Sequence, residues 1–403
     1  MPVPAWGLKP IAGSPLLFNR SPGRVRRVGH RGLCYTRVMY LERLELDHFR
    51  LYERLRLEVP RPGLCLVGGN ATGKTSLLEA IYYLATARSF RFAADADLAR
   101  HGAEGFVLRA TLARADRELR LALSYRRGGK TAAVDGERCS RLSDILGRLV
   151  TCCFTVEDLD TIRGSAGRRR RFLDLLLGQV SPRYTRAAAE LQANLKQRNA
   201  ALRREPFDAA AVRAWDGPLA RSAALVTELR RAAVDELIEP ARLAFSELSG
   251  TTLQLRLDYE GALEETRLDA AALEEPFLEL WRRNLERDRR RGYTTKGPHR
   301  DDLALRLDDV DLRRYASRGQ QRLAVVALRL AEAEFLARRT GTRPVFLLDD
   351  VASELDDAIS ARLLPALEER VDQLILTCLP QDLDQLSAGR PAYGVGGGAV
   401  EAL

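Results

Sequence analysis

The stretch Gly68-Gly-Asn-Ala-Thr-Gly-Lys-Thr75 follows a short apolar run that begins at Gly63 and precedes a predicted helix from Lys74 to about Ala87. It matches the pattern GxxxxGK[ST] at every fixed position, between a strand and a helix. Glycines let backbone N–H groups close around phosphate oxygens, and a helix N-terminus adds partial positive charge. We therefore expect Lys74 to reach the β- and γ-phosphates of a nucleotide and the Thr75 hydroxyl to ligate Mg²⁺. The predicted nucleotide contacts are Gly68, Gly69, Asn70, Ala71, Thr72, Gly73, Lys74 and Thr75, with a chance glycine-rich turn as the alternative.

A pair of carboxylates far along the chain is the expected second half of this site. Pro344-Val-Phe-Leu-Leu-Asp349-Asp350 has the pattern of a buried strand that ends in two acids. Ligands bind at the carboxyl ends of parallel strands, so Asp349 is expected to face the same crevice as the glycine-rich loop. We expect Asp349 to hold Mg²⁺ directly or through water, and Asp350 to orient or deprotonate the attacking water. A solvated turn is the structural alternative for this pair taken alone.

A third segment, Tyr315-Ala-Ser-Arg-Gly-Gln320, precedes a predicted helix from about Gln321 to Arg338. Ser317 with Gln320 fits a capping box, which is the structural interpretation. The functional interpretation is that Ser317, Gly319 and the helix N-terminus form a second anion site. Such a segment cannot easily reach the phosphate loop of its own chain in a compact head. It would contact the γ-phosphate bound by another copy, so that ATP would hold two heads together.

The hydrophobic pattern predicts one α/β unit interrupted by a helical insert. Alternating apolar residues between Tyr40 and Phe154 indicate strands, and apolar strands return after Gly297. Helical spacing indicates helices between these parts at 183–204, 217–238 and about 270–291, punctuated by Pro182, Pro206 and Pro240. The predicted divisions are a disordered leader 1–38, an N-terminal lobe 39–171, a helical insert 172–296 and a C-terminal lobe 297–403.

The net charge of +9 belongs mostly to the leader. The first 38 residues contain seven Lys or Arg and no acid, so 57 basic and 55 acidic residues remain beyond them. The leader fits either a transit peptide or, as we favour, a stretch upstream of a true start at Met39. Six scattered cysteines without a CxxC pair argue against a zinc site or disulfides and fit a reducing cytoplasm. No stretch approaches the ~20 apolar residues of a membrane span. We therefore expect a cytoplasmic protein without a membrane partner.

Two basic clusters are candidates for contact with DNA phosphates. Residues 281–300 contain eight Lys or Arg and two acids, and Arg163 with Arg168–Arg171 forms an acid-free group. Clustered donors suit phosphate contacts, although a charged run is equally a solvated helix face. Arg168–Arg171 has a further interpretation as a structural or nucleotide-sensing group. His299, beside Arg300, fits a structural hydrogen-bonding residue better than a catalytic one.

The phosphate loop, the SRGQ segment and the LLDD–SELD strand end together resemble the ABC-type ATPase heads of the SMC relatives. Within that group, three longer stretches resemble the RecF family of bacterial recombination proteins. They are Tyr40–Tyr52, Glu157–Asp174, and Gly297–Leu303 followed by YASRGQQ. The resemblance extends from Met39 nearly to the end of the chain. It implies an α/β fold in which an ABC-type P-loop ATPase head, with a mixed sheet and helices, carries an inserted and mostly helical arm.

The resemblance also implies a function. It indicates a slow ATPase that uses ATP and Mg²⁺, dimerises on ATP and switches its DNA binding by hydrolysis. The family binds single-stranded and gapped duplex DNA without sequence specificity, works with RecR and RecO to load RecA, and supports SOS induction. Family roles carry over to Lys74 and Asp350 in hydrolysis, to Asp349 on Mg²⁺, and to the loop Ser353–Asp356 that couples the heads. The implied contacts to a nucleotide on the other copy are Ser317, Arg318, Gly319, Gln320 and Asp356.

The chain also departs from the family pattern, and other classes of protein compete with it. Val156 and Ala166 stand where prolines are usual, and Thr377 stands at the position that resembles the histidine switch of transporter ATPases. A γ-phosphate histidine is therefore not expected, whereas Arg50 is a candidate nucleotide contact. A transport ATPase subunit lacks a long helical insert, an SMC-type tether needs sustained heptads, and an ATP-dependent nuclease needs a further acidic domain. None of the three fits this chain as well.

Overall fold

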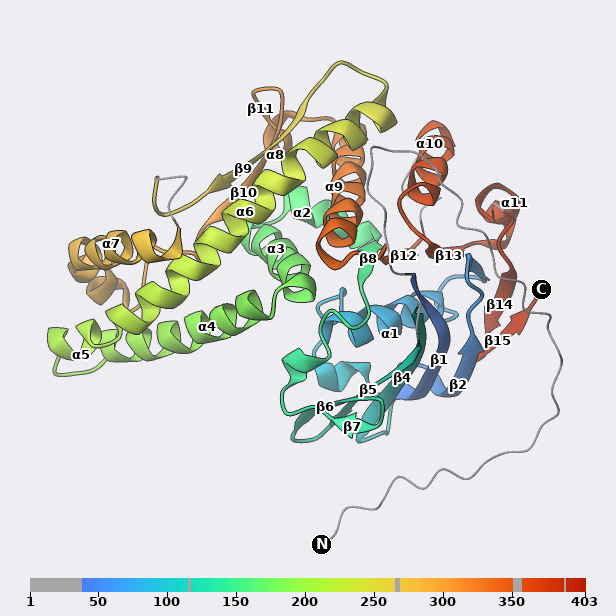
Figure 1. Ribbon diagram of the computed structural model, residues 1–403, viewed down its shortest axis with the longest axis horizontal. Coiled ribbons are helices and arrows are strands. Elements are labelled where there is room, and N and C mark those ends of the chain that lie inside the picture. Colours follow the sequence, from blue (N-terminus) through green and yellow to red (C-terminus); the bar gives the residue numbers. More distant parts are fainter. Residues whose placement is uncertain (1–37, 115–116, 265–268, 351–356, 388) are drawn as a thin grey trace, which may run out of the picture. The chain divides into compact units, whose positions relative to one another are not determined.

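The computed structural model describes residues 38–114, 117–264, 269–350, 357–387 and 389–403 (Figure 1). The predicted leader, apart from its last residue, lies outside the described residues, and so does the predicted coupling loop Ser353–Asp356. Within the described part, the strands form two six-stranded sheets and one three-stranded sheet.

The first sheet carries the phosphate loop. Its strand order is β15-β14-β3-β13-β12-β8, and all neighbours are parallel except β14 and β15. Strands β3, β8, β12 and β13 are buried along their whole length, as expected for apolar runs covered on both faces. The carboxyl ends of β3, β12 and β13 therefore meet at one edge. The bounds are β3 Gly63–Val67, β8 Thr151–Phe154, β12 Val345–Leu348, β13 Gln373–Cys378, β14 Ala392–Gly396 and β15 Ala399–Ala402.

The second sheet is antiparallel, with strand order β2-β1-β4-β5-β6-β7. Its alternating apolar residues face helix α1 (Lys74–Thr86), which contacts strands of both six-stranded sheets. Every residue of α1 except Thr75 is buried. This leaves the hydroxyl of Thr75 as the point where the helix opens to the edge of the first sheet. The bounds are β1 Met39–Phe49, β2 Tyr52–Glu58, β4 Gly105–Arg114, β5 Glu118–Arg126, β6 Gly129–Val134 and β7 Glu137–Arg138.

The longest helices of the described part lie between residues 182 and 340. Helix α6 contacts α4, α7 and α9, as Figure 1 also shows. None of the helices in the described part combines the length and the apolar character that a bilayer crossing needs. The bounds are α2 Asp160–Arg163, α3 Ala166–Val180, α4 Pro182–Leu202, α5 Ala209–Arg213, α6 Asp216–Ser249, α7 Ala270–Arg291, α8 Leu312–Tyr315, α9 Arg318–Thr340, α10 Asp357–Glu368 and α11 Leu383–Leu386.

The expectation that Pro240 ends a helix is wrong. Helix α6 continues through Pro240 to Ser249. A proline removes one backbone hydrogen bond from the helix interior, at a cost of about 3 kcal/mol. The buried face of α6, which includes Pro240 itself, packs against α4, α7 and α9 and offsets that cost.

The third sheet joins segments on both sides of a predicted boundary. Its order is β11-β10-β9, with β9 at Leu255–Glu260, β10 at Asp302–Leu307 and β11 at Val310–Asp311. Strand β9 lies inside the predicted insert, whereas β10 follows its predicted end at residue 296. The division into lobes and an arm stays a prediction, and its boundary falls between two paired strands.

A buried ionic network joins α4, α6 and α7. The fully buried guanidinium of Arg198 donates to Asp216 and Asp288, each at 2.8 Å, and to the hydroxyl of Thr294. Asp288, also fully buried, accepts further bonds from the backbone N–H and hydroxyl of Thr295. The network fixes the end of α7 against the other two helices.

We expect Asp288→Ala to lower the free energy of unfolding by about 3–5 kcal/mol, because it leaves the charge of Arg198 buried with one carboxylate fewer. The control is Glu286→Ala on the exposed side of the same helix. This substitution should change the free energy of unfolding by no more than about 0.5 kcal/mol. Urea unfolding of both variants measures the difference. Equal, small shifts would show that the network contributes little.

Candidate nucleotide site

The loop between β3 and α1 requires glycine at two positions. Gly73 caps α1 with a φ of 112°, a left-handed value that disfavours residues with a side chain. A Cβ on Gly73 would lie 2.7 Å from the hydroxyl of Tyr52, and one on Gly68 would lie 2.6 Å from the carbonyl oxygen of Val395. Tyr52 also donates to the carbonyl of Gly73 at 3.2 Å, so strand β2 braces the loop. The loop is closely enclosed by its neighbours.

Lys74 bends back over this loop. Its ammonium donates to the carbonyls of Gly68 at 2.6 Å and Gly69 at 2.8 Å, and only 8% of the residue is exposed. Helix α1 begins at Lys74 without a side-chain cap, so its N-terminus lies beside the ammonium. A helix N-terminus and a buried cation together suit a phosphate group.

Asp349 meets the phosphate loop directly. The hydroxyl of Thr75 donates to Asp349 Oδ1 at 2.9 Å, and the hydroxyl of Thr377 donates to the same oxygen at 2.8 Å. The structure therefore brings together the carboxyl ends of β12 and β13 and the start of α1. A hydroxyl beside one carboxylate fits Mg²⁺, which binds through few protein oxygens and keeps water and phosphate as its other ligands.

The electrostatic surroundings of Asp349 favour a cation. Burial raises the pKa of its carboxyl, and the bonds from Thr377 and Thr75 and the charge of Arg91 lower it again. The nearby Glu157 raises it further. A buried carboxylate without a fully compensating positive charge is stabilised by a metal ion.

Asp350 follows at the edge of the sheet in a strained conformation. Its φ is 50°, which is uncommon for a residue other than glycine, and its backbone N–H donates to the hydroxyl of Thr377 at 2.8 Å. Strain of this kind is concentrated at functional sites because the surrounding structure must hold it. Thr377 thus fixes both members of the acidic pair.

The SRGQ segment forms the N-terminus of α9. Ser317 accepts from the N–H of Gln320 at 3.2 Å, and the Gln320 side chain accepts from the N–H of Ser317 at 2.9 Å, which completes a capping box. Ser317, Arg318 and Gly319 are exposed. Among the described residues, no hydrogen bond joins residues 317–320 to the loop 68–75. Asp356, expected beside this segment, lies outside the described residues.

Several side chains around this site make interactions that the sequence did not indicate. The Arg50 guanidinium binds the fully buried Glu79 of α1 through two bonds, at 2.7 and 2.8 Å, so its predicted nucleotide contact stays a prediction. Glu79 also accepts from Ser89. The charges of Arg91 and Glu157 act on the pKa of Asp349. Glu157 begins the RecF-like stretch Glu157–Asp174, but no motif marks Arg91. Thr377 had been noted only as a replacement for a histidine.

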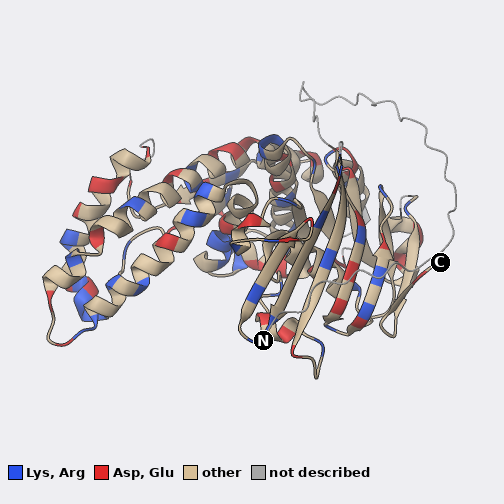
Figure 2. Cartoon of the chain, turned by 60° about the horizontal axis from the view of Figure 1, so that its bottom comes forward, with Lys and Arg blue, Asp and Glu red and all other residues tan. Residues whose placement is uncertain are grey.

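The basic cluster near residue 168 is used inside the protein. Arg169 binds Asp302 with two bonds of 2.7 Å, Arg170 donates to the carbonyl of Asp301, and Arg171 donates to that of Ser89. Arg168 stacks on the ring of Phe92, with 3.6 Å between the guanidinium carbon and the ring centre. In contrast, the arginines of α7 are exposed. Figure 2 marks the positions of Lys and Arg along the helices.

His299 has a structural environment. Its Nε2 donates to the carbonyl of Thr294 at 2.9 Å, and burial lowers the pKa of the imidazole to about 4. The bond to Thr294 partly opposes this shift, while the charges of Arg300 and Arg170 add to it. The ring is neutral near pH 7.

This pKa predicts acid sensitivity. The unfolded chain binds a proton on His299 below about pH 6.5, whereas the folded chain does so only near pH 4, so stability is lost as the pH falls through this window. We expect a loss of about 2 kcal/mol at pH 5. His299→Gln should remove this contribution and His101→Gln, at an exposed position, should keep it. Urea unfolding at pH 7 and at pH 5 measures the free energy of unfolding of each variant. An unchanged pH dependence in His299→Gln would contradict the assignment.

Comparisons with known proteins agree with this geometry. The family model of the RecF/RecN/SMC N terminal domain matches residues 40–395. The DNA replication and repair protein RecF of Herpetosiphon aurantiacus is 38% identical over 375 residues, which cover 87% of this chain and 95% of that protein. RecF of Synechococcus sp. (strain JA-3-3Ab) is 38% identical over 347 residues, which cover 84% of this chain and 91% of that protein. A solved structure of the recombination mediator protein RecF with ATPrS, in the RecFOR pathway, has a TM-score of 0.84 at 29% identity. The match covers 91% of this chain and 98% of that one. An Smc head domain from Pyrococcus furiosus, at a TM-score of 0.53 and 17% identity, shares the fold.

In this chain a phosphate loop contacts an acidic strand end in a mostly parallel sheet, and a separate sheet is antiparallel. This combination defines an ATPase head of the ABC type. The predicted α/β fold class is thereby confirmed. Within this class, the chain belongs to the RecF family, as the resemblance in its sequence indicated.

Proposed function

We propose that this protein is an ATP-dependent DNA-binding protein of recombinational repair and replication restart. Two copies close on ATP and hold DNA, and hydrolysis releases them. The observation that carries this proposal is the contact of Thr75 with Asp349 at 2.9 Å beside the Lys74 loop. It assembles, in one chain, the residues for a triphosphate and its Mg²⁺.

Each residue of the site has a distinct task in this proposal. Phosphate oxygens replace the carbonyls of Gly68 and Gly69 as partners of the Lys74 ammonium. Thr75 and Asp349 would hold Mg²⁺, which supplies positive charge against the β- and γ-phosphates. Asp350 orients the attacking water and accepts its proton, at a position fixed by Thr377.

The second half of each site comes from another copy. Ser317, Arg318 and Gly319 are exposed at the start of α9, a helix that runs to Thr340. Its N-terminus attracts an anion. The capping box holds Ser317 in place, so the structural and functional interpretations of this segment are compatible. We assign to it, with Gln320 and Asp356, the contact with the γ-phosphate bound by the other copy.

DNA and the mediator proteins are the proposed partners. The relatives are named for DNA replication and repair, and one solved relative is a recombination mediator of the RecFOR pathway. By analogy we assign to this chain binding to single-stranded and gapped duplex DNA, cooperation with RecR and RecO in loading RecA, and support of SOS induction. Arg287 and Arg291, which are exposed on α7 and take part in no ion pair among the described residues, are better placed for phosphates than Arg169–Arg171, whose donors are already bonded.

Filter binding of gapped and blunt duplex DNA, with and without ATP at two salt concentrations, tests this function. We expect ATP to increase retention, gapped DNA to be retained more strongly, and affinity to fall steeply with salt. Asp349→Asn should bind DNA equally with and without ATP. If the unmodified protein retained equal amounts of DNA with and without ATP, the proposal that ATP switches DNA binding would be refuted.

A further inference from the structure

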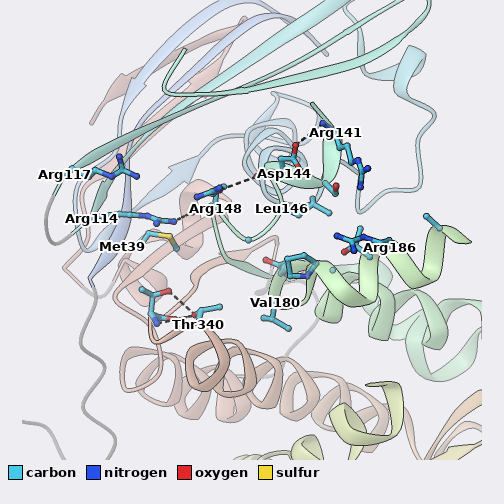
Figure 3. A pocket seen from close by; sticks show the side chains of 18 of the residues that line it. Met39, Arg114, Arg117, Arg141, Asp144, Leu146, Arg148, Val180, Arg186 and Thr340 are labelled. Carbon is cyan, nitrogen blue, oxygen red and sulfur yellow. Dashed lines mark hydrogen bonds between the residues drawn. The ribbon is translucent and has the colours of Figure 1, made fainter. Parts of the chain in front are cut away.

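A groove of about 1060 Å³ lies away from the nucleotide site (Figure 3). It is bordered by the start of β1, the end of β4, the short helix Leu142–Asp144, the junction of α3 and α4, and the segment after α9. Thr340 and Thr342, which line it, precede the amino end of β12. Asp349 and the phosphate loop lie at the opposite, carboxyl edge of the same sheet. The groove is therefore separate from the ATP site.

The charge of the groove is strongly one-sided. Among the described residues, five arginines and one acid, Asp144, line it, and Figure 3 shows Arg114 and Arg148 across from Arg186. A backbone bond from Arg141 and the hydroxyl of Ser140 lower the pKa of Asp144, which stays ionised. The arginines are Arg114, Arg117, Arg141, Arg148 and Arg186.

Four of these arginines, Arg117, Arg141, Arg148 and Arg186, have few carboxylate partners among the described residues, and the charges of Arg141 and Arg148 act on Asp144. Within the described residues, Arg141, Arg148 and Arg186 form no ion pair, and Arg117 has Asp135 at 3.8 Å. Arginines elsewhere, such as Arg283 with Glu279 at 2.6 Å, are closely paired. Arg114 donates to the carbonyl of Arg148 at 2.8 Å, and Arg148 donates to that of Asp144 at 3.3 Å, so both side chains are held in place. Positioned guanidinium groups bind carboxylate or phosphate in a bidentate manner.

The remaining lining identifies the kind of anion. Aliphatic side chains contribute to it, among them Met39, Leu146 and Val180, and none of the described residues that line it is aromatic. Single-stranded nucleic acids bind through bases stacked on aromatic side chains, which this groove lacks. Aliphatic surface between arginines suits a chain that carries both carboxylates and aliphatic side chains.

We propose that this groove binds an acidic peptide segment of a partner protein, with its carboxylates on the arginines and its aliphatic side chains against Met39, Leu146 and Val180. This inference goes beyond the ATP-switched binding of DNA and does not rest on it, because no residue of the nucleotide site lines the groove.

Fluorescence anisotropy of the full chain tests the proposal, with a labelled peptide of alternating Asp, Glu and Leu as the probe. We expect saturable binding that weakens with salt and is lost when Asp and Glu are replaced by Asn and Gln. The double variant Arg141→Glu/Arg186→Glu should bind about tenfold more weakly or worse. The matched control is Arg183→Glu, which lies on the same helix as Arg186 but outside the groove.

Two further readouts guard against misfolding and against a nucleic-acid site. Arg186→Gln, a milder change, should also weaken binding of the acidic peptide. The double variant, whose groove carries added glutamates, should gain affinity for a peptide of Lys and Leu. Either absence of saturable binding by the acidic peptide or equal weakening by Arg183→Glu would overturn the proposal. The proposal would also be overturned if oligothymidylate displaced the peptide and no longer bound to the double variant. The groove would then be a DNA site.

Discussion

Lys74→Arg is expected to abolish ATP hydrolysis while the chain keeps its fold. The Lys74 ammonium is buried under the loop and lies 2.6 and 2.8 Å from two carbonyls, a space too small for a planar guanidinium. The arginine keeps the positive charge but cannot place it where the ammonium lies, and loss of one preorganised hydrogen-bond donor at a site of developing charge lowers the rate by about 10²–10³. Phosphate release measures the rate, and thermal unfolding checks the fold.

Lys130→Arg is the matched control for this substitution. Lys130 is also partly buried, bonded to the carbonyl of Ala87 and paired with Asp95 at 3.0 Å, but it lies on β6 away from the loop. Its replacement should leave turnover unchanged. Unchanged turnover in Lys74→Arg would exclude this loop as the chemical centre.

Asp350→Asn is expected to bind ATP and to form a long-lived dimer. The amide keeps the shape of the side chain but cannot accept a proton from water, so we expect hydrolysis to fall by about 10²–10⁴. Asp349 and its bonds from Thr75 and Thr377 remain, so binding of ATP persists. Light scattering in ATP should show twice the mass of the monomer for hours after the unmodified protein has reverted.

Asp349→Asn separates the two acids. It weakens the contact with Mg²⁺, and we expect little dimer at any time. A monomeric Asp350→Asn variant in saturating ATP would count against closure by nucleotide, and equal behaviour of the two variants would show that the acids share one role.

The contact at the core of the candidate nucleotide site could be predicted from sequence because each part has a local signature. The loop 68–75 has fixed glycine spacing, and Asp349 ends an unbroken apolar strand. The rule that ligands bind at the carboxyl ends of parallel strands then places them together, and Thr75 and Asp349 do lie 2.9 Å apart.

Residues that act through tertiary contact have no such signature. Glu79 lies in the middle of α1 and is matched by Arg50, 29 positions away. Arg91, in a turn, and Glu157, in the short helix Val156–Leu159, act on the pKa of Asp349 from separate segments of the chain. The same limit applies to the basic cluster, because nothing in a run of arginines shows that Arg169 binds Asp302. Pro240 misled the interpretation since packing of α6 outweighs local propensity.

The central claim is that each ATP lies between the phosphate loop of one copy and Ser317 of another. Lys74→Arg and Ser317→Arg should each be inactive alone. If the contact is between copies, a mixed dimer has one fully intact site, and an equimolar mixture should regain about a quarter of normal turnover. Measured phosphate release that stays at the level of the separate variants, although the two chains exchange, would contradict the account.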